Sequence, residues 1–325
     1  MASKNESTVV HQPDGVSEHH TLGSRSQEHD KEDAEQLAPP SRKYLVGFKL
    51  YAVFSALLLS MFLVALDMTI VATAIPRITQ DFHSLEQVGW YGSAFFITLA
   101  MFQSAWGKAY KYFPLKTSFF ASVAIFEIGS LLCALSPNST ALIIGRAIQG
   151  LGGAGITGGC YTIIAHIVEP TRVAAFIGWI GAVFSCASVA GPLLGGVFTE
   201  KVSWRWCFYI NLPIGAASLV LLLILFHTPS SAKPVPASSR EKLLQMDLPG
   251  VCVGLASLVC YILALEWAGV KKTWGSGAVI GTLVAWIVLT AAFVATQWYR
   301  KERASLVFRI LGQKHVAWCC VFIFL

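Results

Sequence analysis

Eight long apolar stretches follow one another along this chain, separated by shorter segments that carry most of its charges. They cover residues 50–75, 88–106, 117–135, 141–164, 174–198, 206–226, 248–268 and 277–298. Each approaches or exceeds the ~20 residues that an α-helix needs to cross about 30 Å of hydrocarbon. A last stretch, 316–325, would rise only about 15 Å as a helix, which is too short to cross. The sequence therefore predicts an all-α membrane protein with eight spans and an incomplete ninth.

Composition agrees with this class and argues against others. The chain is 55% hydrophobic and 13% charged, whereas soluble proteins carry about 25% charge. The basic residues lie in loops and do not form one face, so we expect membrane lipid and no nucleic acid as a partner. The segments between the stretches are too short for a catalytic domain. They hold no metal-binding or nucleophile–base group of residues, so we expect no enzyme and no cofactor.

The distribution of lysine and arginine predicts the orientation. With the N-terminus in the cytoplasm, fifteen of those near the membrane lie inside and five outside, as the positive-inside rule requires. Residues 1–48 lack the apolar core of a signal peptide and predict a disordered cytoplasmic tail. We expect a multi-pass protein of the plasma membrane, with the vacuolar membrane as the alternative.

The spacing of the stretches predicts a domain organisation. Short loops join the first six, so residues 49–226 are expected to form a six-helix unit in which consecutive helices are antiparallel neighbours. Residues 227–247 are rich in serine, proline and lysine and predict a flexible cytoplasmic linker. Two further helices would occupy 248–298, followed by a cytoplasmic loop and the partial ninth helix in 299–325. Transporters built from three-helix repeats commonly have such a six-helix half.

Ionisable groups at membrane depth are candidates for function, because each costs about 2.5–3.5 kcal/mol to insert. Asp67 and Arg146 have opposite charges at similar depths. They are expected either to share a cavity or to pair directly; the alternative for Arg146 is that its long side chain reaches the outer surface.

Three more polar residues lie deep in the predicted spans. Glu127 is near the middle of the third, where it is either protonated and packed, bonded to a neighbouring helix, or directly involved in transport. Gln103 and Gln149 are uncharged and are candidates for lining a polar path.

Glycine is concentrated in the fourth and fifth stretches. In lipid, small residues let helix backbones approach closely. The fifth stretch also contains Gly191, Pro192, Gly195 and Gly196, and a proline there removes a backbone hydrogen bond and favours a kink. The pattern fits both tight static packing and a contact that moves, and composition does not separate the two.

Four segments carry a resemblance to a known family. They read LDMTIVATAIP at 66–76, GRAIQGLGG at 145–153, AGPLLGG at 190–196 and WRWCFYINLP at 204–213. In this order they resemble the first-helix motif, the R-x-x-Q-G motif, the G-P-x-x-G-G antiporter motif and the start of helix 6. The family is the major facilitator superfamily, and the group within it is the fungal fourteen-helix drug:proton antiporters.

The resemblance implies a fold and a function. It implies an MFS-type N-terminal six-helix bundle with two additional transmembrane helices. It also implies proton-coupled export of hydrophobic small molecules such as drugs or fungal secondary metabolites. Asp67, Arg146 and Glu127 are then the proton-coupling candidates, and Gly191–Gly196 a hinge. Protons, a small hydrophobic substrate and a C-terminal half absent from this chain are the implied partners.

An alternative function and one departure remain. The alternative is a truncated membrane protein that does not transport.

The departure lies at 107–116, which reads GKAYKYFPLK. The superfamily's motif G-x-x-x-D-R-x-G-R-K has an aspartate where this chain has Lys111, so a charge-pair gate that depends on that aspartate is not expected here.

Overall fold

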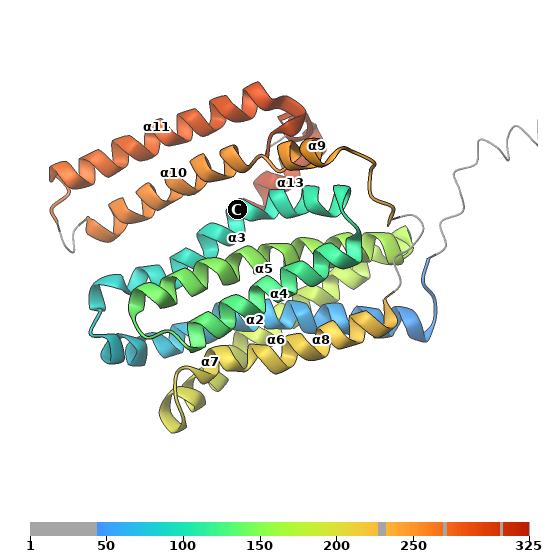
Figure 1. Ribbon diagram of the computed structural model, residues 1–325, viewed down its shortest axis with the longest axis horizontal. Helices are drawn as coiled ribbons and strands as arrows, with labels where there is room; N and C mark the ends of the chain where they lie inside the picture. The colour runs from blue at the N-terminus through green and yellow to red at the C-terminus, as the bar shows by residue number, and fades with distance from the viewer. Residues whose placement is uncertain (1–43, 227–231, 269–271, 306–307, 325) are drawn as a thin grey trace, which may run out of the picture. The chain divides into compact units, whose positions relative to one another are not determined.

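The computed structural model describes residues 44–226, 232–268, 272–305 and 308–324. Most of the predicted tail lies outside these residues, and the description concerns the unit Tyr44–Leu325. Its long helices coincide with the predicted stretches (Figure 1). They are α2 (Phe48–Phe82), α3 (Val88–Tyr112), α4 (Leu115–Ala134), α5 (Ser139–Ile167), α6 (Pro170–Lys201), α7 and α8 (Trp206–Tyr209 and Asn211–Leu225), α10 (Leu248–Trp267) and α11 (Gly277–Arg300).

Shorter helices connect or follow them. They are η1 (Leu85–Gln87), α9 (Ser239–Gln245), η3 (Lys301–Arg303), α12 (Phe308–Leu311) and α13 (Lys314–Phe324). With 11 residues, α13 rises about 16 Å and is too short to cross a bilayer. The described part of the predicted linker contains helix α9, so it is partly helical.

Six segments of the described chain are both long and apolar enough to cross a membrane: Phe48–Phe82, Leu115–Ala134, Pro170–Lys201, Trp206–Leu225, Ser239–Trp267 and Gly277–Arg300. The remaining two, α3 and α5, have 25 and 29 residues and are long enough. Their mean hydropathy is lower than that of the other six segments. In α5 the lower value follows from its glycines together with Arg146 and Gln149. Membrane crossing by these two helices stays a prediction.

The boundaries differ from the predicted ones at prolines. Helix α2 continues through Pro76, and α6 includes Pro170 at its start and Pro192 inside. The sixth stretch is instead divided at Ile210. Pro213 has no N–H group to bond to the carbonyl of Tyr209 four residues earlier, so α7 ends there. The backbone of Ile210 keeps helical angles, and the chain continues directly as α8.

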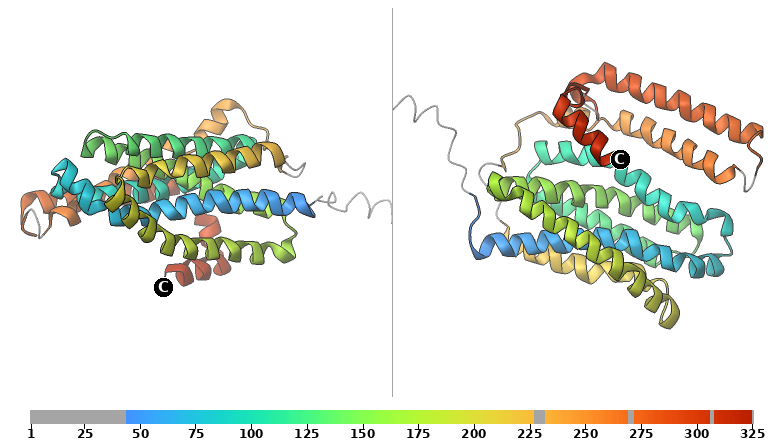
Figure 2. Two further views of the ribbon diagram at one scale, coloured as in Figure 1. Left: turned by 90° about the horizontal axis from the view of Figure 1, so that it is seen from below. Right: turned by 180° about the vertical axis from the view of Figure 1, so that it is seen from behind.

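The closest helix pairs are mostly not consecutive in sequence. Besides α4 with α5 and α10 with α11, the most extensive packing joins α3 to α5, α2 to α6 and α2 to α8. The views of Figures 1 and 2 show α2 and α6 running side by side. Consecutive helices such as α2 and α3 pack less closely, so the expectation that sequence neighbours form the main contacts holds only for part of the bundle.

Glycines on α5 explain its central place. A Cβ at Gly152 would lie 2.7 Å from the Cα of Phe126 on α4, and one at Gly150 would overlap the backbone of α3. The close approach also exposes α5 carbonyl groups to side-chain donors. The indole of Trp106 donates to the carbonyl oxygen of Leu151 at 2.8 Å. The predicted role of these small residues is confirmed.

A buried polar cluster holds the ends of the two additional helices. Asp247 caps α10 and is fully buried. Its carboxylate accepts from Gln297 of α11 at 3.0 Å and from the backbone N–H of Ser305 at 2.9 Å, and lies 3.4 Å from Arg300. This carboxylate therefore ties the start of α10 to the end of α11.

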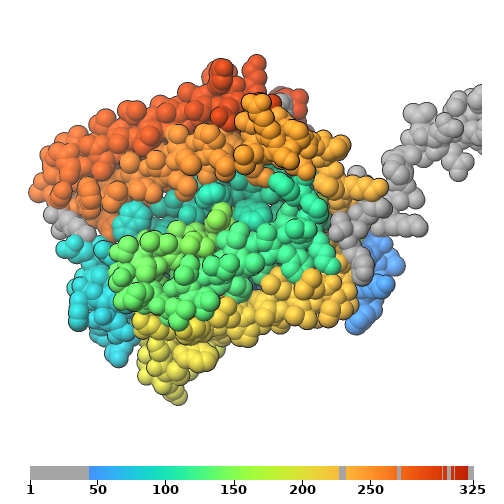
Figure 3. Space-filling view, viewed as in Figure 1, coloured from blue at the N-terminus to red at the C-terminus, as the bar shows by residue number. Residues whose placement is uncertain are grey.

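Lys108 joins the same region to α3. Its ammonium group donates to the carbonyl oxygens of Arg303 and Ala304 at 2.7 and 2.6 Å. Burial lowers the pKa of Lys108, and the charge of Asp247 acts in the opposite direction. Helix α10 also packs along α3, as the orange and teal surfaces in Figure 3 show.

We expect Asp247→Ala to lower the free energy of unfolding by about 3 kcal/mol or more, because it leaves several buried donors without their acceptor. Thermal unfolding in detergent, followed by tryptophan fluorescence, measures this. The matched control is Glu169→Ala, since Glu169 also caps a helix but makes no side-chain cap bond. Equal destabilisation by the two substitutions would contradict the role assigned to Asp247.

Candidate functional site

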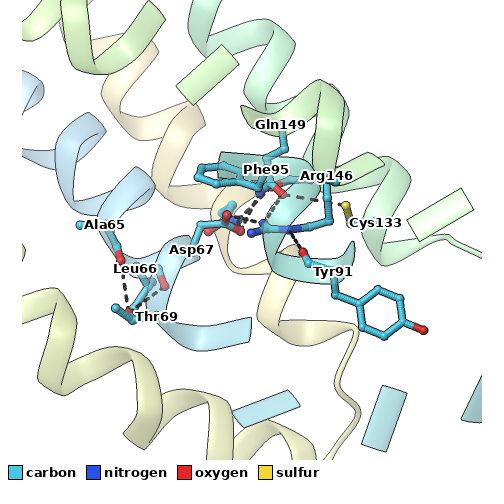
Figure 4. A network of polar contacts seen from close by, with 12 residues as sticks. Ala65, Leu66, Asp67, Thr69, Tyr91, Phe95, Cys133, Arg146 and Gln149 are labelled. Carbon is cyan, nitrogen blue, oxygen red and sulfur yellow. Dashed lines mark hydrogen bonds and ion pairs between the residues drawn. The ribbon is translucent and has the colours of Figure 1, made fainter. Parts of the chain in front are cut away.

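Two opposite charges meet inside the bundle. Nη1 of Arg146 on α5 lies 2.5 Å from Oδ2 of Asp67 on α2, and both side chains are buried, with 1% and 0% exposed. Figure 4 shows the guanidinium group reaching the carboxylate directly. Of the alternatives that the sequence left open, the structure therefore shows direct pairing, and Arg146 does not extend to the surface.

The guanidinium group is held from several sides. Its Nε donates to the carbonyl oxygen of Tyr91 on α3 at 2.9 Å, and Nη1 also donates to Oε1 of Gln149 at 2.7 Å. The centre of the group lies 4.4 Å from the ring centroid of Phe95, at a distance where a cation–π interaction is favourable. These contacts fix both the position and the plane of the arginine.

The second carboxylate oxygen of Asp67 is also occupied. Oδ1 accepts from Nε2 of Gln149 at 2.7 Å and from Nδ2 of Asn211 at 3.3 Å. Both amides donate further to the hydroxyl of Ser130 on α4, at 2.7 and 2.8 Å. Side chains from α2, α4, α5 and α8 thus join in one network.

This network compensates the free-energy cost of burying the ion pair. Removing two charges from water costs several kcal/mol per ion, and attraction compensates only when hydrogen bonds satisfy the remaining groups. Here each oxygen of Asp67 has a donor. Protonating Asp67 would remove the negative charge that holds Arg146, and breaking a buried pair on one side costs about 3–5 kcal/mol. The ion pair therefore contributes to the contact between α2 and α5.

Buried apolar clusters lie on both sides of this site along α2. One includes α2 residues up to Val64, and the other begins at Ile70. Asp67 lies between these two positions. The polar network is therefore enclosed along the helix by packed apolar side chains.

The glycine motif of α6 lies against the same part of α2. A Cβ at Gly191 would lie 2.8 Å from the Cβ of Thr69, and one at Gly195 would lie 2.8 Å from the carbonyl oxygen of Ile70. The hydroxyl of Thr69 also donates to the carbonyl oxygen of Ala187 on α6 at 3.1 Å. This contact begins two residues after Asp67.

The other two members of the motif face elsewhere. Pro192 is exposed, and a Cβ at Gly196 would meet nothing within 4 Å. Only half of the predicted hinge therefore contacts α2.

The structure places the remaining predicted site residues in three different environments. Gln149 lies at the centre of the network, whereas the side chain of Gln103 is exposed on α3 and is not part of it. Glu127 lies on α4, where both of its carboxylate oxygens are buried and lack a hydrogen-bond partner among the described residues.

Sequence reasoning missed Ser130, Asn211 and the carbonyl group of Tyr91. Asn211 lies within a segment that was already recognised as a motif, and a polar residue in a predicted span was the available signal. Ser130 is a common small residue in membrane helices and gives no such signal. A backbone carbonyl is present at every position, so its role follows only from the packing of α3 against α5.

Two basic residues lie on either side of the turn between α3 and α4, Lys111 in the last turn of α3 and Lys116 in the first turn of α4. Lys116 donates to the carbonyl oxygens of Leu223 and Phe226 at 2.9 and 2.8 Å, at the end of α8. Cations are favourable there because the last carbonyl groups of a helix lack partners. The backbone oxygen of Lys111 accepts from the N–H of Val235 at 3.0 Å. The side chain of Lys116 thus binds the end of α8, whereas Lys111 binds the segment after α8 through its backbone.

Comparison with known families decides the classification. The family model of the Major Facilitator Superfamily matches residues 57–324. The chain belongs to this superfamily. Its members are membrane transporters and not enzymes, in agreement with the expected class.

Curated fungal relatives are similar to this superfamily member over most of its length. It is 51% identical to the MFS-type transporter grgE of Penicillium sp., covering 86% of this chain and 50% of that one. It is 47% identical to the efflux pump notK of Aspergillus sp. (88% and 51%) and 42% identical to a dehydrocurvularin exporter of Alternaria cinerariae (99% and 56%). The chain spans about half the length of the curated relatives it matches.

Among solved structures, the superfamily member is similar to a bacterial homologue of the human lysosomal transporter Spinster. The TM-score is 0.45 and the sequence identity 18%, covering 79% of this chain and 64% of that one.

We expect Gly191→Ala and Gly195→Ala each to destabilise the protein by about 1–3 kcal/mol, because the added methyl group overpacks the contact with α2. Thermal unfolding in detergent measures this. Gly196→Ala is the matched control: there is space for its methyl group, and alanine favours the helix by up to ~1 kcal/mol. Equal losses at all three positions would show that the α2–α6 contact is not the cause.

Proposed function

We propose that this superfamily member takes part in proton-coupled export of hydrophobic small molecules, such as drugs or fungal secondary metabolites. The observation that carries the proposal is the buried pair of Asp67 and Arg146, because its strength depends on one titratable carboxylate. Relatives named as efflux pumps and exporters support the direction of transport. The proton and a small hydrophobic substrate are the proposed partners, with membrane lipid around the helices.

The geometry suggests how a proton would act. Protonation neutralises Asp67 and leaves Arg146 with the carbonyl of Tyr91 and the amide of Gln149. The contact between α2 and α5 is then weaker, and α2 can shift against α6 along the face that Gly191 and Gly195 keep free of side chains. Substrate would bind between this six-helix unit and a second half, since transporter sites lie at the interface between repeats.

A second candidate is a membrane protein that does not transport by itself. Because the chain spans about half the length of the curated relatives it matches, transport by this chain alone is part of what has to be tested. Sequencing the transcript beyond the codon for Leu325 separates the two. An open reading frame for further spans favours the transporter, and a stop codon favours the second candidate.

The proposed location is the plasma membrane, or alternatively the vacuolar membrane, with the N-terminus in the cytoplasm. In a cysteine-free background, we expect single cysteines at Lys111 and Lys242 to react with an impermeant thiol reagent from the cytoplasmic side. A cysteine at Lys201 should react only from the opposite side. Labelling of positions 111 and 242 from opposite sides would overturn the proposed orientation, and the export scheme with it.

The role of Asp67 can be tested by Asp67→Asn. In proteoliposomes with an imposed pH gradient, we expect the chain, when paired with a second half, to move a lipophilic dye such as rhodamine 6G, and Asp67→Asn to abolish this movement. Asparagine keeps the size of the side chain and removes the titratable charge.

The matched control is Asp81→Asn on the same helix, where the carboxylate is partly exposed, at 39%. This variant should transport normally. Transport that survives in Asp67→Asn would remove Asp67 from the mechanism. A wild-type chain that incorporates correctly and moves no dye of a broad panel would favour the second candidate.

A further inference from the structure

Glu127 is a carboxyl group that the network around Asp67 does not use. Both of its oxygens are buried without a hydrogen-bond partner among the described residues. They lie against α8 at Gly215, where a Cβ would overlap the carboxyl group. Since glycine is the residue that leaves this space, the sequence of α8 accommodates the glutamate at this point.

Residue spacing on α4 and on α8 places Glu127 close to the Asp67 network. On α4, Glu127 lies three residues before Ser130, and on α8, Gly215 lies four residues after Asn211. Residues three or four apart share a face of a helix, one turn or about 5.4 Å along it. Ser130 and Asn211 are bonded to each other. Glu127 therefore lies one turn from this bond, on the cytoplasmic side in the proposed orientation.

A second unsatisfied atom belongs to Asn211, about one helical turn away. Nδ2 of Asn211 donates to Asp67 and Ser130, but its Oδ1 is buried without a partner among the described residues. A buried acceptor without a donor destabilises the folded state. A proton on Glu127 is a donor of the kind that this oxygen lacks.

Burial of both carboxylate oxygens without a partner among the described residues favours a neutral Glu127. Arg146, on the helix packed against α4, is engaged by Asp67. An ionised carboxylate that is buried without partners is strongly disfavoured. The other ionisable side chains on α4 and the helices packed against it are Lys116 and Cys133 on α4, Tyr91, Lys108, Tyr110, Lys111 and Tyr112 on α3, Cys160, Tyr161 and His166 on α5, and Cys207 and Tyr209 on α7; α8 has none.

We propose that Glu127 is a second proton-binding residue, which exchanges a proton with Asp67 beside the amide of Asn211. This inference rests on the proposed proton coupling and adds the path by which the proton leaves. In the proposed starting state, Glu127 carries a proton and Asp67 is paired with Arg146. When Asp67 has taken up a proton from the outer side and Glu127 has lost its own to the cytoplasm, the O–H bond of Asp67 breaks and one forms on Glu127. Charge and protons balance, and Asp67 pairs with Arg146 again.

The buried face of α8 extends this arrangement. Asn211, Gly215, Ser218 and Leu222 are its buried residues. The hydroxyl of Ser218 is hydrogen-bonded to that of Ser60 on α2. Small and polar residues thus extend one turn beyond Glu127 along the buried face of α8, and the next buried residue is the apolar Leu222.

Infrared spectroscopy of the full chain in lipid nanodiscs tests the proposal without any substrate. At neutral pH we expect the C=O stretch of a protonated carboxylic acid, which Glu127→Gln removes and Asp67→Asn retains. The matched control is Glu200→Gln, an exposed glutamate at the end of α6, which should leave this band unchanged. A band that persists in Glu127→Gln, or its absence from the wild type, would overturn the proposal.

Gly215→Ala provides a second variant that keeps the carboxyl group. Its methyl group displaces Glu127, so we expect the band to shift in frequency while Glu127→Gln abolishes it. An unshifted band in a folded Gly215→Ala protein would contradict the assigned position. Failure of the proposed export appears instead as absent dye movement in the wild type, which leaves the infrared band in place, so the two failures are distinguishable.

Discussion

The buried pair of Asp67 and Arg146 is the constraint on which the arrangement of the bundle depends. A charge in this position is tolerated only if its partners are fixed within hydrogen-bonding distance. Those partners come from α3, α4, α5 and α8 as well as α2. The network therefore sets which helices must meet at this depth, and apolar packing above and below it completes the bundle.

Glycine residues allow these helices to pack closely around the ion pair. On α5, glycines let α3 and α4 approach closely enough for the carbonyl oxygen of Tyr91 to accept from Arg146 and the hydroxyl of Ser130 to accept from Gln149. On α6, Gly191 and Gly195 bring a further helix against α2 beside the same aspartate. The polar contacts and the close backbone contacts thus lie at the same place. The proposed coupling of protonation to movement would act at this place, where glycines leave little side-chain volume between α2 and α6.

Different parts of the site were accessible to sequence reasoning to different degrees. Asp67, Arg146 and Gln149 stand out because polar groups are rare in apolar stretches, and the similar depth of Asp67 and Arg146 left a shared cavity or direct pairing open. Gln103 carries the same signal, yet its side chain is exposed. A helical stretch does not by itself say which of its faces turns inward when several faces are apolar. Asn211 and Ser130 gave weaker signals, because small polar residues also occur in membrane helices without any special role.

The sequence by itself determined the helices, their approximate limits and the family, because hydrocarbon requires long apolar segments with satisfied backbones and because four motifs occur in the right order. Only the tertiary structure decided which helices are partners. Short loops suggested neighbours in sequence, but close packing joins α2 to α6 and α3 to α5, since backbone approach depends on glycine faces that must match in three dimensions. It also decided that Glu127 lies opposite Gly215 without a partner, a relation between distant residues that no local pattern contains.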